Sequence, residues 1–382
     1  MIYLDNAATS FPKPERVYNE IIRCMRQYCA NPGRGGHAMS MEAGRAVARA
    51  REEISSFFNI RDHMQLCFTK NATEALNIAI KGSLNPGAHV ITTCMEHNSV
   101  MRPLKTLERD IGIDITVITG NDFGEIDPDM FKKKIRRNTS LIISTLSSNV
   151  NGIIMPVKDI GRIAREAGIP FLLDASQGAG ALPVHVEEQN IDMLAFPGHK
   201  GLMGPQGTGG IYVRKGIKVR SLYEGGTGSN SESMFQPDYM PDFFESGTLN
   251  TPGIVGLSQG IGFINEIGLD NICSYKHKLT SRLLEGLKEI RGVRLYSRLE
   301  RTGNSGIAAI NLDGFDSTEI SHILDREFQT ATRAGIHCSP TAHRTLGTSD
   351  TGIVRISPGY FNTVSEIDFV IRVLEKISQK SK

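Results

Sequence analysis

The 382-residue chain contains no tryptophan and no long run of apolar residues. A transmembrane helix needs roughly 18 or more consecutive apolar residues, and no segment of the chain approaches that length. The first residues, MIYLDNAATSFPKP, have neither the basic start nor the apolar stretch of a secretory signal peptide. We therefore expect a cytoplasmic protein that does not enter a membrane.

An excess of charge of either sign is also lacking. The 43 lysine and arginine residues oppose 41 aspartate and glutamate residues, which leaves a net charge of +2 and no electrostatic case for a nucleic-acid partner. The six cysteines form no CxxC pair. In a chain of this length that pattern indicates reduced thiols rather than a disulfide framework.

What the chain does contain is an alternation of two patterns. Short apolar stretches rich in β-branched residues alternate with segments whose apolar residues recur every three or four positions. Such alternation predicts a mostly parallel sheet covered by helices. Buried strands are expected at 65–69, 89–93, 141–145, 171–174, 193–196 and 209–213, and helices at 74–82, 128–137 and 158–168.

The pattern changes after the last of these strands. Residues 214–258 are rich in Gly, Ser, Asp and Phe with little periodicity, which predicts a long functional loop. A second unit is expected from about residue 259 to 382. Its predicted elements are helices at 258–268, 274–291 and 364–379, and strands at 306–312 and 352–357.

Chemically active side chains follow the predicted strands where each strand ends. In open α/β sheets, ligands bind beyond the carboxyl ends of the strands. Five clusters at five strand ends therefore predict one shared crevice, which is hard to reconcile with a purely structural protein. The clusters are Asn71 with Thr73, Glu96 with His97, Asn149, Asp174 with Gln177, and His199 with Lys200.

Each cluster also has an ordinary structural explanation. Asn71 and Glu74 resemble a capping box, whose free backbone N–H groups could hold a phosphate or simply begin a helix. Asp174 ends an apolar strand, so its carboxylate needs a cation. A protonated pyridine nitrogen would serve, and so would a structural salt bridge.

Lys200 has glycines close on both sides, at positions 198 and 201. Glycines permit the close approach of a planar ligand, and a lysine amine is the nucleophile for a Schiff base. A solvated lysine is the alternative. His199 could donate to a phosphate or be an ordinary loop histidine.

Cys338 lies in the loop sequence RAGIHCSPTAHRTLG, whereas the other five cysteines lie in apolar settings typical of packing. We interpret Cys338 as a reactive thiolate close to Arg333 and His337. The set of His337, Cys338 and His343 lacks a fourth ligand and a recognised spacing, so we expect no metal site.

Eight motifs together resemble the class V aminotransferase-like, pyridoxal-phosphate-dependent enzymes, in the branch of cysteine desulfurases and selenocysteine lyases. They span about residue 3 to about residue 363: YLDNAAT, NATEALN, MEHNS, SSNVNG, DASQ, PGHKGLMGPQGTG, SGTLNTPG and RAGIHCSP. The resemblance implies the type I fold of these α/β transferases. It has a large, mostly parallel seven-stranded domain at 15–258, and a smaller α+β domain formed by 1–14 and 259–382.

The resemblance also assigns roles in holding pyridoxal 5'-phosphate. Lys200 would form the Schiff base and move the substrate α-proton, and Asp174 would keep the pyridine nitrogen protonated, making the ring an electron sink. His97 would stack on the ring, while Gln177 and Asn149 would bond the ring oxygen or the substrate.

The phosphate would be bound by Thr73, the backbone near Ala72 and His199, and by Thr248 of a neighbouring subunit, which implies a homodimer with shared sites. The motif position two residues before His199, which usually carries Ser or Thr, is Pro197 and has no donor.

For the substrate, the resemblance implies that Arg355 clamps the α-carboxylate in a bidentate manner. Arg34, Arg333 and Ala8 are further expected substrate-site residues. Cys338 would take the sulfur of L-cysteine as a persulfide, release L-alanine and pass sulfur to an acceptor protein, as in iron–sulfur cluster assembly. Selenocysteine lyase and class V aminotransferase remain alternatives, and a scaffold that only binds cofactor is disfavoured by the retained site residues.

Overall fold

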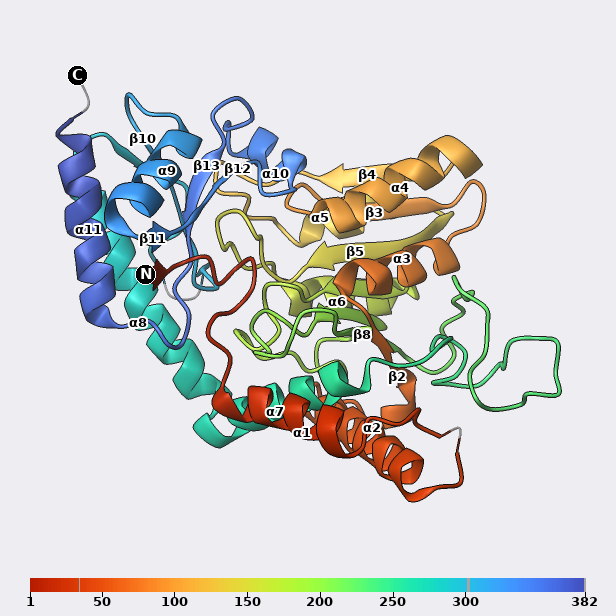
Figure 1. The fold of residues 1–382 in the computed structure, drawn as a ribbon. Helices are drawn as coiled ribbons and strands as arrows, with labels where there is room; N and C mark the ends of the chain where they lie inside the picture. Colours follow the sequence, from red (N-terminus) through yellow and green to blue (C-terminus); the bar gives the residue numbers. More distant parts are fainter. Residues whose placement is uncertain (34, 301–302, 381–382) are drawn as a thin grey trace.

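The computed structural model describes residues 1–33, 35–300 and 303–380 (Figure 1). Within these ranges a large sheet has the strand order β2-β8-β7-β6-β5-β3-β4. β8 runs antiparallel to both of its neighbours, and the other pairings are parallel. The strands are β2 (Leu66–Thr69), β3 (His89–Thr93), β4 (Asp114–Ile118), β5 (Thr139–Thr145), β6 (Phe171–Asp174), β7 (Met193–Pro197) and β8 (Gly209–Val213).

Helices cover both faces of this sheet because successive strand side chains point to opposite sides. In β5, Ile142 joins one hydrophobic core, whereas Leu141 and Ile143 join the core on the other face. Helices α2 (Ala38–Phe57), α6 (Val157–Ala167) and α7 (Thr251–Ile267) close the first core, and α3 (Ala72–Ser83) and α4 (Asn98–Ile111) close the second. The remaining helical elements of this part are α1 (Glu15–Gln27), η1 (His63–Gln65) and α5 (Asp129–Lys134).

A second, antiparallel sheet has the order β12-β13-β10-β9 and packs against its own helices. The first residues of the chain join this part, because β1 pairs with β11 and Leu4 lies in its core (Figure 1). Its elements are β1 (Ile2–Tyr3), α8 (Leu269–Lys288), β9 (Val293–Leu295), β10 (Ala308–Leu312), α9 (Ser317–Phe328), β11 (Thr330–Ala331), β12 (Arg333–Gly335), α10 (Pro340–Thr345), β13 (Ile353–Ile356) and α11 (Val364–Ser378).

The expected fold class is confirmed: the molecule is α/β with a mostly parallel central sheet and a smaller α+β part. The division at 258/259 stays a prediction, and it falls inside α7. One interpretation was wrong, because the predicted loop 214–258 ends in a helix. Asn250 caps α7 by accepting a hydrogen bond from the Gly253 backbone N–H.

The sequence interpretation also overlooked β4. This edge strand is mostly half-buried, so it lacks the continuous apolar run of the central strands. Within the described ranges, no helix has both the length and the apolar character needed to cross a bilayer.

Candidate active site

A cavity of about 90 Å³ opens at the carboxyl ends of the parallel strands. Every one of the five predicted clusters contributes to its wall, so the strand-end argument correctly brought them together. The lining residues are Asn71, Ala72, Thr73, His97, Ser99, Thr145, Ser147, Asn149, Asp174, Ser176, Gln177, Pro197, His199 and Lys200.

Lys200 follows β7 and lines this cavity. Burial lowers the pKa of its amine to about 8, and the charge of Asp174 opposes that shift. The backbone of Lys200 is fixed from the first segment of the chain, because the Ser10 hydroxyl donates to the Lys200 carbonyl at 2.8 Å. A lysine with this pKa is uncharged often enough near neutral pH to act as a nucleophile.

Asp174 ends β6 and is almost fully buried. Its Oδ1 accepts hydrogen bonds from the backbone N–H of Ser176, at 2.9 Å, and from the Ser176 hydroxyl. These bonds fix the carboxylate in the cavity, where a cationic ring nitrogen could pair with it.

His97 begins α4, where its Nδ1 accepts the Ser99 backbone N–H at 3.0 Å. Burial lowers the pKa of the imidazole to about 4, so the ring is neutral at physiological pH. The Ser99 hydroxyl also lies 2.8 Å from the Thr73 hydroxyl, which links the starts of α3 and α4.

The start of α3 is a true helix cap, as the simpler interpretation of Asn71 proposed. Its side chain accepts the Glu74 backbone N–H at 2.9 Å, while Glu74 accepts from the Lys70 N–H instead of closing a capping box. In the described part of the chain, the first backbone N–H groups of α3, at Ala72 and Thr73, have no recorded acceptor. Such N–H groups can bind an anion.

His199 contributes a second unused polar atom. Its Nδ1 is buried and has no hydrogen-bond partner within the described residues, and burial lowers the pKa of the ring to about 4. Pro197 also lines the cavity but offers no donor.

Asn149 and Gln177 line the cavity, yet both are already engaged. Gln177 Nε2 donates to the Ala7 carbonyl at 2.9 Å. Asn149 Nδ2 donates to the His337 carbonyl at 2.7 Å, and its Oδ1 accepts from the Ser339 hydroxyl at 2.7 Å. The Asn149 amide therefore holds the loop around Cys338, residues 336–339, which we call the cysteine loop.

Cys338 is exposed and lies at the edge of the same site. Its carbonyl accepts the Asn98 backbone N–H at 2.8 Å, directly beside His97. Both His337 and Cys338 adopt left-handed backbone conformations, with φ of +52° and +58°. Because non-glycine residues rarely adopt them, the hydrogen bonds of Asn149 and Asn98 must hold this turn in place.

His337 and His343 pack with ring centroids 5.8 Å apart. Burial lowers the pKa of His337 to about 2, so its imidazole is neutral. Among the described residues, no group of three or more His, Cys, Asp or Glu side chains is arranged to hold a metal ion.

Arg355 is buried on β13, opposite Arg333 on β12. It donates to Asp5 Oδ1 and to the Asn149 carbonyl, both at 2.8 Å, and its Nε is buried without a partner within the described ranges. Three of its five N–H donors therefore remain for a ligand. The charge of Arg333 lowers the pKa values of Lys200 and His97, which places it near the site.

The remaining predicted residues are positioned differently. Ala8 lies in a turn in which its backbone N–H donates to the Asp5 carbonyl at 3.0 Å. Asp5 is also the residue whose carboxylate binds Arg355. Thr248 is exposed and does not line the cavity formed by its own chain. Arg34 lies outside the described residues.

Sequence reasoning gave no role to Asp5, Ser99 or Ser339. Asp5 lies within the YLDNAAT motif and Ser99 within MEHNS, so the motifs could have signalled them. Ser339 lies within RAGIHCSP, but the motif could not reveal its role, because its contact with Asn149 joins residues 190 positions apart.

A mostly parallel sheet with a half-buried lysine and a buried carboxylate at its carboxyl edge, beside a smaller α+β part, defines the type I class of pyridoxal-phosphate enzymes. The family model described as aminotransferase class-V matches residues 2–370. The chain therefore belongs to the class V aminotransferase family, whose members are enzymes that depend on pyridoxal phosphate.

Individual relatives agree with this assignment. The chain is 34% identical to a probable cysteine desulfurase of Methanothermobacter thermautotrophicus, over 99% of this chain and 94% of that protein. It is 32% identical to the cysteine desulfurase IscS of Methylobacillus flagellatus, over 98% and 91%. The apo structure of cysteine desulfurase from Thermococcus onnurineus superposes with a TM-score of 0.93 and 33% identity, covering 99% and 94% of the two chains.

Proposed function

We propose that the protein is a cysteine desulfurase that holds pyridoxal 5'-phosphate and converts L-cysteine to L-alanine, with the sulfur taken up by Cys338. The observation that carries this proposal is the tether between the cavity and the cysteine loop. Asn149 lines the cavity and bonds the His337 carbonyl and the Ser339 hydroxyl on either side of Cys338. A transaminase would need no thiol at this position.

The donor set fits the proposed cofactor. Lys200 offers an amine for the aldehyde, and Asp174 offers a carboxylate for a protonated ring nitrogen. The free N–H groups at the start of α3 and the unpartnered His199 Nδ1 offer donors for a phosphate. When bound, the cofactor supplies an electron sink for the carbanion formed at the substrate α-carbon.

The chain's own residues supply the remaining chemistry. The Lys200 amine, with its pKa near 8, accepts the substrate α-proton and can return it. Arg355 orients the substrate carboxylate with the N–H groups that Asp5 and Asn149 leave free. The neutral imidazole ring of His97 lines the cavity and would offer its flat face to the cofactor ring.

At the far end of the substrate, the Cys338 thiolate attacks the substrate sulfur. A new S–S bond forms as the Cβ–S bond breaks, and the substrate carbon keeps the electron pair and gains a proton. L-cysteine plus the Cys338 thiol thus yields L-alanine plus a Cys338 persulfide, which an acceptor protein would remove.

We also propose a cytoplasmic homodimer with shared sites. Thr248 is exposed and lies outside its own cavity, as a residue that serves a partner's site would. Exposed apolar side chains on α1 and α2 offer a surface for a second copy: Tyr18, Ile22, Met25, Met39 and Met41. None of the six cysteines, all of which lie in the described ranges, forms a disulfide, in keeping with a reducing compartment. Light scattering should give twice the chain mass, and a monomer mass would contradict the dimer.

The deciding experiment measures alanine release from L-cysteine and, separately, from L-selenocysteine. We expect Cys338→Ala to lose cysteine turnover while it keeps the cofactor absorbance, and Lys200→Ala to lose both. Cys29→Ala removes the other exposed thiol and is the matched control. Mass spectrometry should find the extra sulfur atom on the Cys338 peptide.

Three outcomes would contradict the proposal. Unchanged cysteine turnover in Cys338→Ala would remove the persulfide step. Turnover of selenocysteine alone would indicate a lyase, and release of no alanine from either substrate would indicate a transaminase.

A further inference from the structure

A second cavity, of about 480 Å³, is lined by the segments that follow strands β5 and β6 and by helix α8. It shares no lining residue with the candidate active site. One wall carries apolar side chains from the large part of the chain, namely Leu146, Ile154, Met155, Pro156, Val157, Leu182 and Pro183. The other lining residues come from α8, from residues 304–306, and from Lys158, Asp159, Ala181 and Gln189.

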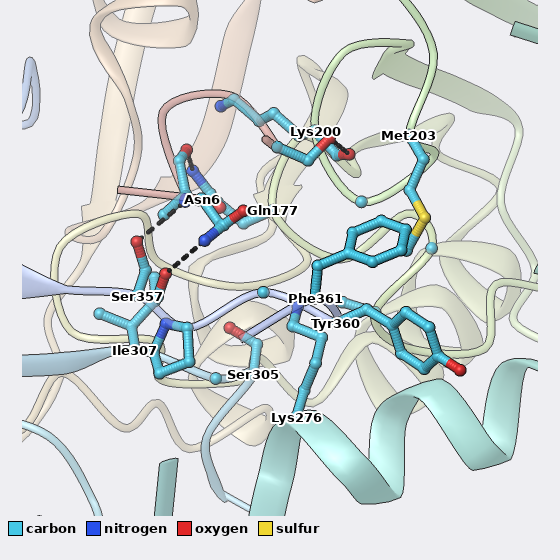
Figure 2. Close-up of a pocket in the computed structure, with 18 of the residues that line it drawn as sticks. Asn6, Gln177, Lys200, Met203, Lys276, Ser305, Ile307, Ser357, Tyr360 and Phe361 are labelled. Carbon is cyan, nitrogen blue, oxygen red and sulfur yellow. Dashed lines mark hydrogen bonds between the residues drawn. The ribbon is translucent and has the colours of Figure 1, made fainter. Parts of the chain in front are cut away.

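Lys276 brings a positive charge into this apolar space. Figure 2 shows its side chain extending from α8 toward Ser305 and Phe361. A Cβ atom added at Gly306 would lie 3.7 Å from the Lys276 Nζ, which places the amine against the 304–306 segment. Lys276 also lines the neighbouring smaller cavity drawn in Figure 2, so the amine lies where the two cavities meet.

The amine has no counterion. Within the described residues, the Lys276 Nζ makes no hydrogen bond or ion pair, and burial lowers its pKa more than the Cys273 thiol raises it. Asp159 and Asp270 also line the cavity. However, Asp159 lies 3.6 Å from Arg162, and neither carboxylate affects the Lys276 pKa.

Lys276 is half-buried, and an ammonium beside apolar side chains without a counterion is unfavourable, so an anion that binds beside it would lower that cost. The apolar side chains that line the same cavity favour a hydrocarbon chain on the same molecule. We propose that this interdomain cavity binds a small aliphatic monocarboxylate, with the carboxylate on Lys276 and the chain against Met155, Leu182 and Pro183. The proposal does not rest on the desulfurase activity, although the smaller cavity that Lys276 also lines is shared with Lys200 and Gln177 of the candidate active site.

The test is calorimetric titration of the cofactor-loaded protein with sodium hexanoate, 1-hexanol and hexylamine. We expect hexanoate to bind, hexanol to bind more weakly and hexylamine to show no heat of binding. Lys276→Met keeps an unbranched apolar side chain but removes the charge. It should weaken hexanoate binding at least tenfold.

Two variants serve as controls. Lys278→Met removes an exposed lysine of the same helix and should leave binding unchanged. Lys276→Arg keeps a charge in the cavity and should retain most of the affinity. Lys276→Gln removes the charge and should weaken hexanoate binding at least tenfold, which keeps the test decisive if Lys276→Met does not fold.

Hexanoate could instead bind at Arg355 in the candidate active site. In that case Lys276→Met would bind it as tightly as the wild type, and the proposal would be wrong. The absence of hexanoate binding to the wild type, or equal binding of hexylamine, would also overturn it. None of these outcomes depends on whether L-cysteine is the substrate.

Discussion

Glu96 follows β3 next to the candidate active site and is fully buried. Its Oε1 accepts the Thr93 hydroxyl at 2.6 Å and the Thr145 backbone N–H at 2.9 Å, while its Oε2 is buried without a partner in the described part of the chain. Burial, helped by the nearby charge of Asp174, raises the pKa of this carboxyl to about 8. The folded protein therefore holds a neutral carboxylic acid at neutral pH.

This proton makes the free energy of unfolding depend on pH. The unfolded chain releases the Glu96 proton near its ordinary pKa, about 4.3, whereas the folded chain keeps it up to pH 8. Between these values the folded state binds more protons, so stability must fall as the pH rises. The Glu96 contribution amounts to about 1.4 kcal/mol per pH unit, or about 4 kcal/mol between pH 5 and pH 8.

Glu96→Gln tests this reasoning because an amide keeps the acceptor oxygen and does not titrate. We expect the variant to match the wild type near pH 5 and to become progressively more stable than it toward pH 8. Urea unfolding of both proteins at each pH unit, at constant ionic strength, measures the difference. Other titrating groups cancel in that comparison. Glu289→Gln, at an exposed position, is the control. Parallel stability curves for the wild type and Glu96→Gln would refute a raised pKa.

Three further predictions concern other buried groups. Arg51→Met should cost about 3–5 kcal/mol of unfolding free energy, measured in urea, because it strands the Glu245 carboxylate that Arg51 bonds at 2.7 and 2.8 Å. Ser339→Ala should cost about 1–3 kcal/mol, because the buried Asn149 oxygen loses its donor. Ser339→Ala should also lower cysteine turnover. Its affinity for the cofactor, measured by absorbance, should change little. Uptake of pyridoxal phosphate by the apo-protein should accelerate with rising pH and level off above about 8, because the neutral Lys200 amine is the reactive form.

Each of these predictions has an outcome that contradicts it. For the ion pair, the double variant Arg51→Met with Glu245→Gln should lose less than the sum of the single variants, and strict additivity would show that the pair is uncoupled. For Ser339→Ala, turnover equal to the wild type would show that the hydroxyl does not position the cysteine loop. For the lysine, an uptake rate that does not vary between pH 6 and 9 would assign the reactive group elsewhere.

The central strands were predictable from the sequence because each of them is buried on both faces. A strand such as β7, with the sequence MLAFP and all five residues buried, is an apolar run that predicts a buried strand. β4 lies at the sheet edge and has only one buried residue, so its sequence carries no comparable pattern. In α7 the many glycines look like a loop, yet they allow close packing: a Cβ at Gly256 would come 2.8 Å from Ile21 on α1.

The site residues that follow the parallel strands were predictable from the sequence, because one rule of sheet topology places them together. Parallel strands end at one edge, so the residues after β2, β3, β5, β6 and β7 had to meet. What the sequence does not carry is how the cysteine loop is fixed to that edge, since Ser339 and Arg355 reach Asn149 from 190 and 206 positions away.

These contacts give Asn149 a function that its motif did not reveal. Its side chain bonds the His337 carbonyl and the Ser339 hydroxyl on either side of Cys338, and its carbonyl accepts a hydrogen bond from Arg355. A single residue thus connects the proposed carboxylate clamp to the proposed sulfur nucleophile. Both ends of a small amino-acid substrate would be gripped by groups whose positions depend on the same strand end, and a shift of β5 would move them together.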